Sequence, residues 1–515
     1  MGVKIKGGYQ AELIDSILVD KYFYKVEEPV SEKWIFFDTF DWRLFNKSLT
    51  LHQSGQQLTL RRLTYGDSIE SIKWTSRPVF AWDFPDGSFR KRLESITQAR
   101  AVLMLGEVHT QSRTYRVLNT DLKTVARLVY TQVWSQPDIN SPLLGEYIIL
   151  QPVRGYPRYE QQLTKELEEI GHTTSIIEDI YTSAIKKSRI KPGSYSPKLG
   201  LRFDPSMRSD EAMKTIFLRL LKIMRANEAG ITADVDTEFL HDYRIAIRRT
   251  RSALSQTKNV FPRDITNRFK RDFASMGQIS NSLRDLDVYL LSEGSYRLML
   301  PEVMKDDIHP LFIYLQGQRT LALKDVIRYL ESEDYLQILQ RWEVFIDNSK
   351  SDIYDEINSA LPVIDLARKQ IYTQYRRVVR DGNYILEHTQ DELLHLLRIE
   401  SKKLRYLMEI FAGLFPRKKI TRLIKQLKIL QDNLGEFNDL AVQQEQLLEF
   451  ASEIPVSDKP SKMALVATGY LVETMARRQR IVKAGFAKTF TTFSSKNNQG
   501  LYRELFKYID SGSDS

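Results

Sequence analysis

The chain has 515 residues, no cysteine and a formal net charge of +9. Its length is sufficient for two or three domains with buried cores. The lack of cysteine excludes disulfides and thiolate metal sites. The positive balance favours a polyanionic partner: nucleic acid, polyphosphate or an anionic membrane.

The first residues, MGVKIKGGYQ, lack the apolar segment of a signal peptide, and Lys6 breaks the myristoylation pattern. No apolar run reaches the roughly 20 residues that a membrane helix needs. We therefore expect a cytoplasmic protein without a membrane partner. The oligomeric state stays open.

Residues before about position 190 carry a pattern typical of β-strands. Seven segments combine aromatic and β-branched residues, often in alternation, and are separated by Gly, Asp, Ser and Pro. They are KWIFFDTF, SLTLHQ, QLTLRRL, SIESIKW, RTYRVLN, ARLVYTQVW and GEYIILQPV. A helical pattern, PRYEQQLTKELEEIG, follows them. We predict a β-rich domain at residues 1–190.

The pattern changes after this domain. Residues 191–208 are rich in Pro, Gly, Ser and basic side chains, which is typical of a linker. From 209 to 510 the sequence alternates long amphipathic runs with capping and turn residues, which predicts an all-helical domain. The fold class is therefore α+β with two domains. The last residues, SGSDS, are expected to be disordered.

The helical region contains an internal repeat at an offset of 154 residues. HDYRIAIRRTRSALSQTKNVFP begins at His241, and HLLRIESKKLRYLMEIFAGLFP begins at His395. The register continues to Asp285-Leu286 and Asp439-Leu440. A lone helical hairpin cannot bury its apolar face. We therefore predict two units of about four helices, at residues 209–350 and 363–510.

Each repeat carries a basic stripe beside its apolar face. Leu240, Tyr243 and Ile247 follow the 3-4 spacing of a helix face that packs on neighbours. The basic residues use the same spacing one position later, so they are rotated by about 100° and border the helix–helix seam. The first stripe comprises His241, Arg244, Arg248 and Arg251, and the second comprises His395, Arg398, Lys402 and Arg405. Arg249 and Lys403 directly follow Arg248 and Lys402 and also occupy equivalent positions in the two repeats.

Further basic residues lie on neighbouring predicted helices. They include Lys222, Arg225, Arg376, Arg380, Arg477 and Arg478. Like charges brought together repel, so folding alone gives no reason to gather them. A bound polyanion would offset this repulsion, and the planar guanidinium suits phosphate oxygens. The alternatives are a solvated charged face for each stripe and, for the histidines, a structural hydrogen bond or metal ligation. Asp285 and Asp439 are expected to orient arginines or cap helices.

HDYRIAIRRTRSAL, NSLRDLDVYL, HLLRIESKKLRYLMEIF and LGEFNDLAV resemble the conserved histidine α-helical domain, CHAD. The resemblance covers roughly residues 209–510. It implies two four-helix bundles related by a pseudo-twofold axis, with a basic channel between them that binds inorganic polyphosphate. It also implies that the two stripes are phosphate ligands, together with Arg249 and Lys403. Arg319 and the region of Arg477 and Arg478 are implied as further ligands. The lysines at 402 and 403 keep the charge and lose bidentate geometry.

FFDTFDWRLFNKSLTLHQSGQQLTLRR resembles the CYTH, or triphosphate tunnel, family. This resemblance implies an antiparallel barrel or tunnel. The family's metal-binding Glu-x-Glu-x-Lys is replaced here by Lys4-Ile5-Lys6, and GEYIILQP keeps Glu146 as its only carboxylate. His52 and Ser54 stand where the family has arginines. We therefore expect no catalytic residues, metal or cofactor, and a domain that still binds anions through Arg61, Arg62 and Lys73.

The sequence thus predicts a protein that binds inorganic polyphosphate in a helical basic channel and localises to polyphosphate granules. Two alternatives remain. One is a metal-dependent triphosphatase or polyphosphatase that acts through the front domain. The other is a nucleic-acid-binding protein, which the stripes disfavour because they lack interleaved aromatic residues for stacking on bases.

Overall fold

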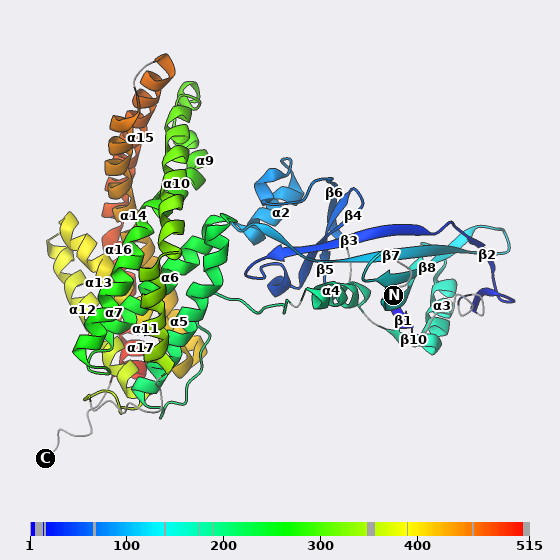
Figure 1. Cartoon of the computed structure of the whole chain (residues 1–515), viewed down its shortest axis with the longest axis horizontal. Coiled ribbons are helices and arrows are strands. Elements are labelled where there is room, and N and C mark those ends of the chain that lie inside the picture. Colours follow the sequence, from blue (N-terminus) through cyan, green and yellow to red (C-terminus); the bar gives the residue numbers. More distant parts are fainter. Residues whose placement is uncertain are drawn as a thin grey trace. The chain divides into compact units, whose positions relative to one another are not determined.

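The computed structural model describes residues 2–5, 14, 17–64, 68–137, 141–173, 175–188, 190–347, 356–388, 390–455 and 458–507. Lys6 and the predicted disordered end, residues 511–515, lie outside these ranges. The chain forms two compact units, Met1–Ser196 and Pro197–Ser515. The first is β-rich and the second is helical (Figure 1), which confirms the predicted α+β class.

The β unit is built on one antiparallel sheet (Figure 1). Its order is β10-β1-β9-β8-β7-β3-β4-β5-β6, and β2 pairs with β7. The strands are β1 (Gly2–Ile5), β2 (Phe23–Val26), β3 (Val30–Thr39), β4 (Leu49–Ser54), β5 (Gln57–Arg62), β6 (Ser68–Lys73), β7 (Val102–Leu118), β8 (Thr124–Trp134), β9 (Leu143–Pro152) and β10 (Gly171–Thr173). All seven predicted strand segments lie in this sheet, and its antiparallel layout is consistent with a CYTH-like barrel or tunnel.

Two helices pack on opposite faces of the sheet. The alternation along β9 places Ile148 and Leu150 in the core that contains Leu163 of α3 (Pro157–Ile170), and Tyr147 in the core that contains Tyr181 of α4 (Ile176–Lys187). A third core includes α2 (Ser88–Thr97). The sequence predicted α3, whereas α2 and α4 were missed. Both missed helices are short, lie in the strand-rich region, and lack a long run of apolar residues at helical spacing.

The helical unit consists of two repeats whose helices begin in register. The first repeat contains α5 (Ser209–Thr232), α6 (Thr237–Gln256), α7 (Arg263–Ile279), α8 (Asn281–Leu291), α9 (Glu293–Met299), α10 (His309–Leu330) and α11 (Glu333–Asp347). The second contains α12 (Val363–Glu387), α13 (Asp391–Ile410), α14 (Arg417–Glu453), α15 (Lys459–Ala484), α16 (Phe486–Phe493) and α17 (Lys496–Phe506). The starts of α5 and α12, α6 and α13, and α7 and α14 all differ by 154 residues.

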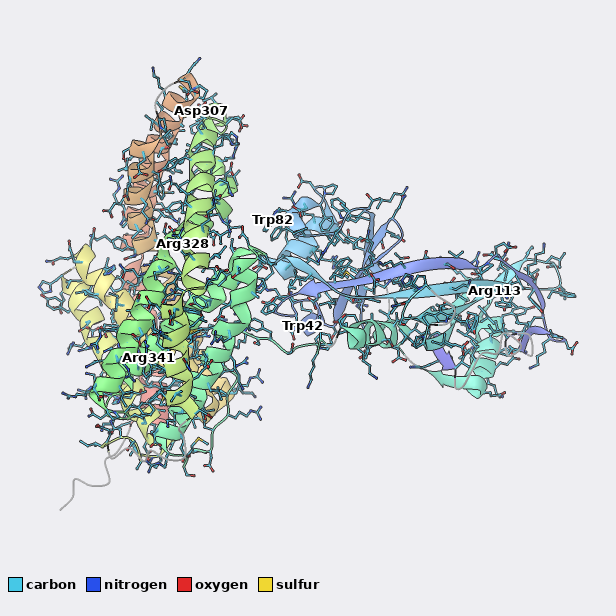
Figure 2. The ribbon with its side chains drawn as sticks, in the orientation of Figure 1. Trp42, Trp82, Arg113, Asp307, Arg328 and Arg341 are labelled. Atoms are coloured by element: carbon cyan, nitrogen blue, oxygen red, sulfur yellow. The ribbon has the colours of Figure 1, made fainter. Side chains whose placement is uncertain are left out.

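The repeats differ where the first one is interrupted. One long helix, α14, occupies the positions equivalent to α7, α8 and α9 of the first repeat. In the first repeat the helix is interrupted at Ser280 and at Ser292. Each repeat also sends helices beyond the main bundle at the same end of the unit: α10, with Asp307 just before its start, and α15 (Figures 1 and 2). No described helix has a stretch long and apolar enough to cross a bilayer.

The repeats meet through equivalent elements, as a pseudo-twofold axis requires. The backbone N–H of Ser209 donates to Leu361 O at 3.0 Å, and the N–H of Val363 donates to Met207 O at 2.8 Å. Ser209 is equivalent to Val363, and Met207 to Leu361, so each bond is the counterpart of the other in the second repeat. The two bonds flank a bridge between Arg208 and Pro362. Helices α5, α6 and α10 likewise contact their own equivalents, α12, α13 and α15.

The packing of α16 on α12 predicts a stability difference between two glycines. A Cβ at Gly382 would lie 1.9 Å from the Phe490 ring, whereas a Cβ at Gly469 meets nothing within 4 Å. We expect Gly382→Ala to lower the free energy of unfolding by roughly 1–3 kcal/mol through overpacking. Gly469→Ala is the matched control and should raise it by about 0.5–1 kcal/mol. Equal effects in denaturant titrations would contradict this packing.

Candidate anion-binding site

The basic stripes lie on α6 and α13 as predicted. Helix α6 begins after Asp236, whose carboxylate accepts hydrogen bonds from the backbone N–H groups of Glu238 and Phe239. The predicted apolar positions, including Leu240 and Ile247, are buried. The stripe residues one position later are half-buried or exposed, so the helix presents them beside its packed face.

The helices α6 and α13 touch and run in opposite directions. Arg249 Nη2 lies 3.0 Å from Glu409 Oε2, and Gln256 Nε2 donates to Lys403 O at 3.3 Å. A later residue on α6 therefore meets an earlier residue on α13. This antiparallel crossing at the pseudo-twofold axis brings equivalent parts of the two stripes together.

Arg248 and Lys402, which occupy equivalent positions, come close at this crossing. The pKa of Lys402 is lowered to about 8, first by burial and then by the charges of Arg398, Arg248 and Arg405, against the opposing effect of Asp439. Within the described residues, no carboxylate lies within ion-pairing distance of Arg248, Arg251 or Lys402. Arg248 and Lys402 therefore bring positive charge to the crossing without an ion-paired carboxylate of their own among the described residues, whereas Glu409 pairs with Arg249 and Arg405. We call His241, Arg244, Arg248, Arg251, His395, Arg398, Lys402 and Arg405 the cationic track.

In the second repeat the cationic track borders a groove of about 490 Å³ between α13 and α14. Arg398, Lys402 and Arg405 line one wall, and the other wall includes Asp432, Glu436 and Asp439. Arg398 Nη2 lies 2.7 Å from Asp439 Oδ1, and Arg478 Nε of α15 lies 2.7 Å from Glu436 Oε1. The His395 ring is hydrogen-bonded to Asn438 through Nδ1.

The first repeat holds its arginine through neutral groups instead. Arg244 donates from Nη1 to Gly277 O at 3.0 Å and to Ser280 Oγ at 2.7 Å, and from Nη2 to Asn281 Oδ1 at 2.8 Å. These acceptors lie where α7 ends and α8 begins. Burial, followed by the charge of Arg248, lowers the pKa of Arg244 to about 10, while Asp285 opposes this shift.

Arg284 is a member of this region that sequence reasoning missed. It lies on α8, and its pKa is lowered by burial, while Glu238 opposes this and Arg248 adds to it. Its side chain therefore adds a cation beside Arg244 and Arg248. The quoted motif NSLRDLDVYL contains this arginine, but its second-repeat equivalent is Asn438, so the comparison of the repeats did not select it.

Several predicted ligands have carboxylate partners. Arg249 pairs with Glu409, Lys403 with Glu400, Arg225 with Glu228 and Glu343, Arg380 with Asp381, and Arg477 with Glu473. Arg319 is held most firmly, because it binds Asp234 at 2.6 Å and the buried Asp287 at 2.7 Å. Lys222 and Arg376 are exposed on α5 and α12.

In the β unit, the residues that the CYTH resemblance aligns with a charged tunnel are packed or paired. His52 is only 1% exposed and lies against the rings of Trp34 and Phe36. Its pKa is lowered to about 3, first by burial and then by Arg61. Glu146 accepts hydrogen bonds from Tyr130 Oη and Gln132 Nε2, and Lys4 lies 3.1 Å from Asp179 of α4.

The predicted anion ligands of the β unit are separated along the sheet. Arg61 pairs in register with Ser68, whereas Lys73 pairs with Gln57 at the other end of β5. Arg61 and Arg62 are consecutive, so their side chains point to opposite faces. Among the described residues no group of three or more His, Asp or Glu is placed to hold a metal ion.

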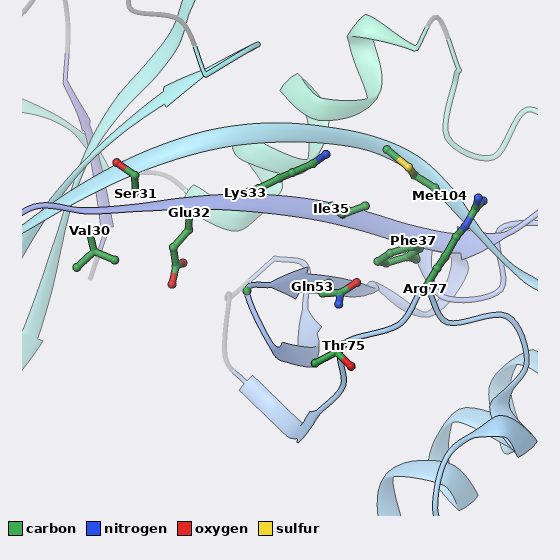
Figure 3. A pocket seen from close by; sticks show the side chains of 11 residues that line it. Val30, Ser31, Glu32, Lys33, Ile35, Phe37, Gln53, Thr75, Arg77 and Met104 are labelled. Atoms are coloured by element: carbon green, nitrogen blue, oxygen red, sulfur yellow. The ribbon is translucent and has the colours of Figure 1, made fainter.

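A separate groove of about 560 Å³ lies along β3 (Figure 3). It is lined by Val30, Ile35, Phe37 and Met104, with Lys33 and Arg77 among its charged side chains. Gln53 at its floor donates to Trp74 O at 3.1 Å, so its amide N–H is satisfied within the protein.

The family comparison identifies the helical unit. Residues 215–448 match the family model of the CHAD domain. The helical unit contains a CHAD domain. Two Mycobacterium tuberculosis relatives, uncharacterized protein MT2285 and uncharacterized protein Rv2226, are each 22% identical over 216 residues. The match covers 41% of this chain, and the chain spans 40% of the length of each relative.

Two solved structures are similar to part of the chain. One is the crystal structure of the CHAD domain from the plant Ricinus communis, with 24% identity and a TM-score of 0.47, which covers 57% of this chain and 96% of that one. The other is PptA from Streptomyces chartreusis, with 16% identity and a TM-score of 0.43, which covers 56% and 98%.

The depressed pKa of Lys402 predicts that this lysine destabilises the CHAD domain. Its folded pKa of about 8 lies below the ordinary value of 10.5, so below pH 8 the folded state holds a charge that is stabilised better in the unfolded chain. We expect Lys402→Met to raise the free energy of unfolding by about 1 kcal/mol, after allowance for the partial exposure of the side chain. The melting temperature should rise accordingly.

This gain should be largest below pH 8 and shrink as the pH rises from 8 towards 10.5, because the folded wild type then releases the proton. Lys403→Met is the matched control, since Lys403 Nζ lies 2.6 Å from Glu400 and should give no such gain. Thermal melts in which both variants behave alike at pH 7 would contradict the assignment.

Proposed function

We propose that the CHAD domain binds inorganic polyphosphate along the cationic track. The observation that carries this proposal is the meeting of Arg248 and Lys402, whose like charges lie close together without an ion-paired carboxylate among the described residues. Such an arrangement costs free energy in the absence of a ligand. A chain of phosphates would supply the missing counter-charge at successive positions. The CHAD family's association with polyphosphate supports the same ligand.

The geometry also favours a ligand whose two ends are alike. The stripes are related by a pseudo-twofold axis, so a chain that passes Arg244 and Arg248 would then meet Lys402 and Arg398 in the reverse order. Arg244 and Arg248 are about 6 Å apart along the axis of α6, and Arg398 and Lys402 are equally far apart along α13. Linear polyphosphate has no direction and fits both halves equally. A nucleic-acid strand has chemical polarity and does not share this symmetry.

Binding would depend on electrostatics more than on shape. Exposed Arg248 and Arg251 can reach phosphates without breaking an ion pair, whereas Arg398 must share its guanidinium with Asp439. Charge-assisted hydrogen bonds to phosphate oxygens are strong, and the net affinity falls as salt rises. A protein that binds polyphosphate in this way would collect at polyphosphate granules in the cytoplasm.

We propose a binding role without hydrolysis for the β unit. In its core, Phe36, Val108 and Tyr147 pack against Tyr181 of α4, and Glu146 already accepts two hydrogen bonds. We therefore expect the full chain to release no phosphate from tripolyphosphate with Mg²⁺ or Mn²⁺ in a colorimetric phosphate assay. Turnover that EDTA abolishes would contradict this expectation and support the hydrolase alternative.

Neutralising the centre of the cationic track should weaken polyphosphate binding. We expect the Arg248→Gln and Lys402→Gln double variant to lose at least about tenfold in affinity, or roughly 1.4 kcal/mol. The slope of log affinity against log salt should fall by about 2, because about one unit is lost per phosphate contact. The measurement is fluorescence anisotropy with labelled polyphosphate at several salt concentrations.

The matched control is the Lys324→Gln and Lys496→Gln double variant, which removes the same charge from exposed positions of α10 and α17. It should retain affinity within about twofold. Equal losses in the two double variants would mean that net charge alone governs binding. Displacement of polyphosphate by single-stranded RNA at equal phosphate concentration would favour the nucleic-acid alternative.

Polyphosphate binding should take up a proton near pH 8. Lys402 faces Arg398 and Arg405 of α13, Arg248 of α6, and Asp432, Glu436 and Asp439 of α14, and its pKa is about 8. A bound polyanion favours the charged amine and raises this pKa. The affinity should therefore fall as the pH rises from 7 to 9. Lys402→Arg should remove this dependence, because arginine stays protonated.

Calorimetry at pH 8.5 in two buffers of different ionisation enthalpy measures the proton uptake directly. A wild-type affinity that stays constant between pH 7 and 9, with no proton taken up, would exclude Lys402 as a phosphate contact.

A further inference from the structure

We propose that Lys402 is a modification site for acyl phosphates. The groove between α13 and α14 presents a lysine amine between guanidinium groups, so a small acyl phosphate bound through its phosphate by Arg398 or Arg405 would hold its acyl carbon beside the Lys402 nitrogen. Holding the reactants together in this way raises the rate of reaction between them. The site would therefore select acyl donors that carry a phosphate.

The contacts of the groove support capture of the phosphate. Arg405 Nε lies 3.5 Å from Glu409 Oε1, and Arg398 holds Asp439 through Nη2. The acids Asp432 and Glu436 line the opposite wall, and Glu436 is neutralised by Arg478. Arg248 adds positive charge from α6. The cations thus outnumber the uncompensated acids around Lys402.

The amine itself is suited to nucleophilic attack. Only the neutral form of a lysine reacts, and burial with the surrounding cations lowers the pKa of Lys402 to about 8. In addition, no carboxylate of the described residues is ion-paired with it. Its neighbour Lys403 is ion-paired with Glu400 at 2.6 Å, so that contact occupies its amine.

The reaction is a simple acyl transfer. The Lys402 nitrogen attacks the carbonyl carbon of the acyl phosphate, a new C–N amide bond forms, and the C–O bond to the phosphate breaks. Inorganic phosphate leaves with the bond's electron pair, and the nitrogen loses its proton to solvent. No oxidant, metal or further reactant takes part.

The modification would act on the cationic track. An amide at position 402 removes one positive charge from the crossing, relieves its repulsion with Arg248, and takes away a phosphate contact. The effect on polyphosphate binding rests on the proposed function, whereas the acylation of Lys402 does not. The cationic track would then respond to the supply of acyl phosphate as well as to polyphosphate.

The test uses the unmodified full chain and acetyl phosphate at pH 8, with the acetylated fractions at Lys402 and Lys403 followed over time by peptide mass spectrometry. Lys403 is an internal control on the same helix, and its side chain is 39% exposed. We expect Lys402 to react at least about fivefold faster than Lys403, since proximity to the captured phosphate and the depressed pKa of Lys402 both favour its reaction. A Lys402 rate equal to or below that of Lys403 would overturn the proposal.

A parallel reaction with acetic anhydride, which has no phosphate, separates capture from reactivity. The preference for Lys402 should be several-fold smaller with this reagent, and an equal preference with both reagents would overturn phosphate capture. Added polyphosphate should protect Lys402 from acetyl phosphate. Rapid, selective acylation that polyphosphate does not slow would leave this inference standing and contradict the proposed polyphosphate site instead.

Discussion

The repulsion between Arg248 and Lys402 is the constraint on which this account depends. A pseudo-twofold axis brings equivalent residues of two repeats together, and here the equivalent residues are both cations. Ordinary packing would place an acid or an apolar side chain at such a position, because an unpaired, partly buried charge costs free energy. The fold tolerates this cost, which the proposed polyphosphate ligand would offset.

The two repeats have diverged around this shared centre. In the first repeat the break between α7 and α8 supplies Gly277 O, Ser280 and Asn281 as neutral acceptors for Arg244. In the second, the continuous α14 supplies Asp439 to Arg398. A polyanion would meet less opposing charge in the first repeat. The first repeat should therefore contribute more of the affinity, and the second more of the sensitivity to pH and modification.

Much of the helical unit could be predicted from the sequence, because its signals are local or repeated. The 3-4 spacing identified the buried faces of α6 and α13, and the 154-residue register anticipated the matching helix starts. The sequence also predicted the strands that carry alternating aromatic and β-branched residues. Short helices such as α4 were not predicted, because they are rich in the residue types that strands favour and are too short for their apolar spacing to distinguish a helix from a strand.

The pairing of individual side chains could not be predicted, because it depends on distances across the tertiary structure. Arg319 looks like the other arginines in sequence, yet it lies between Asp234 and the buried Asp287. Arg249 and Lys403 were predicted to be phosphate ligands, but each is paired with a glutamate. Conversely, Arg284 was recognised as part of the cationic region only from the structure, in which α8 packs beside α6. Sequence reasoning located the cationic surface, and the contacts indicate which of its members are available to a ligand.

A crystal structure of the full chain with bound polyphosphate would test the central claim most directly. The account predicts continuous density for one phosphate chain that passes Arg244 and Arg248 on α6 and then Lys402 and Arg398 on α13. Density on another surface of the helical unit, or two separate anions with nothing between Arg248 and Lys402, would contradict it.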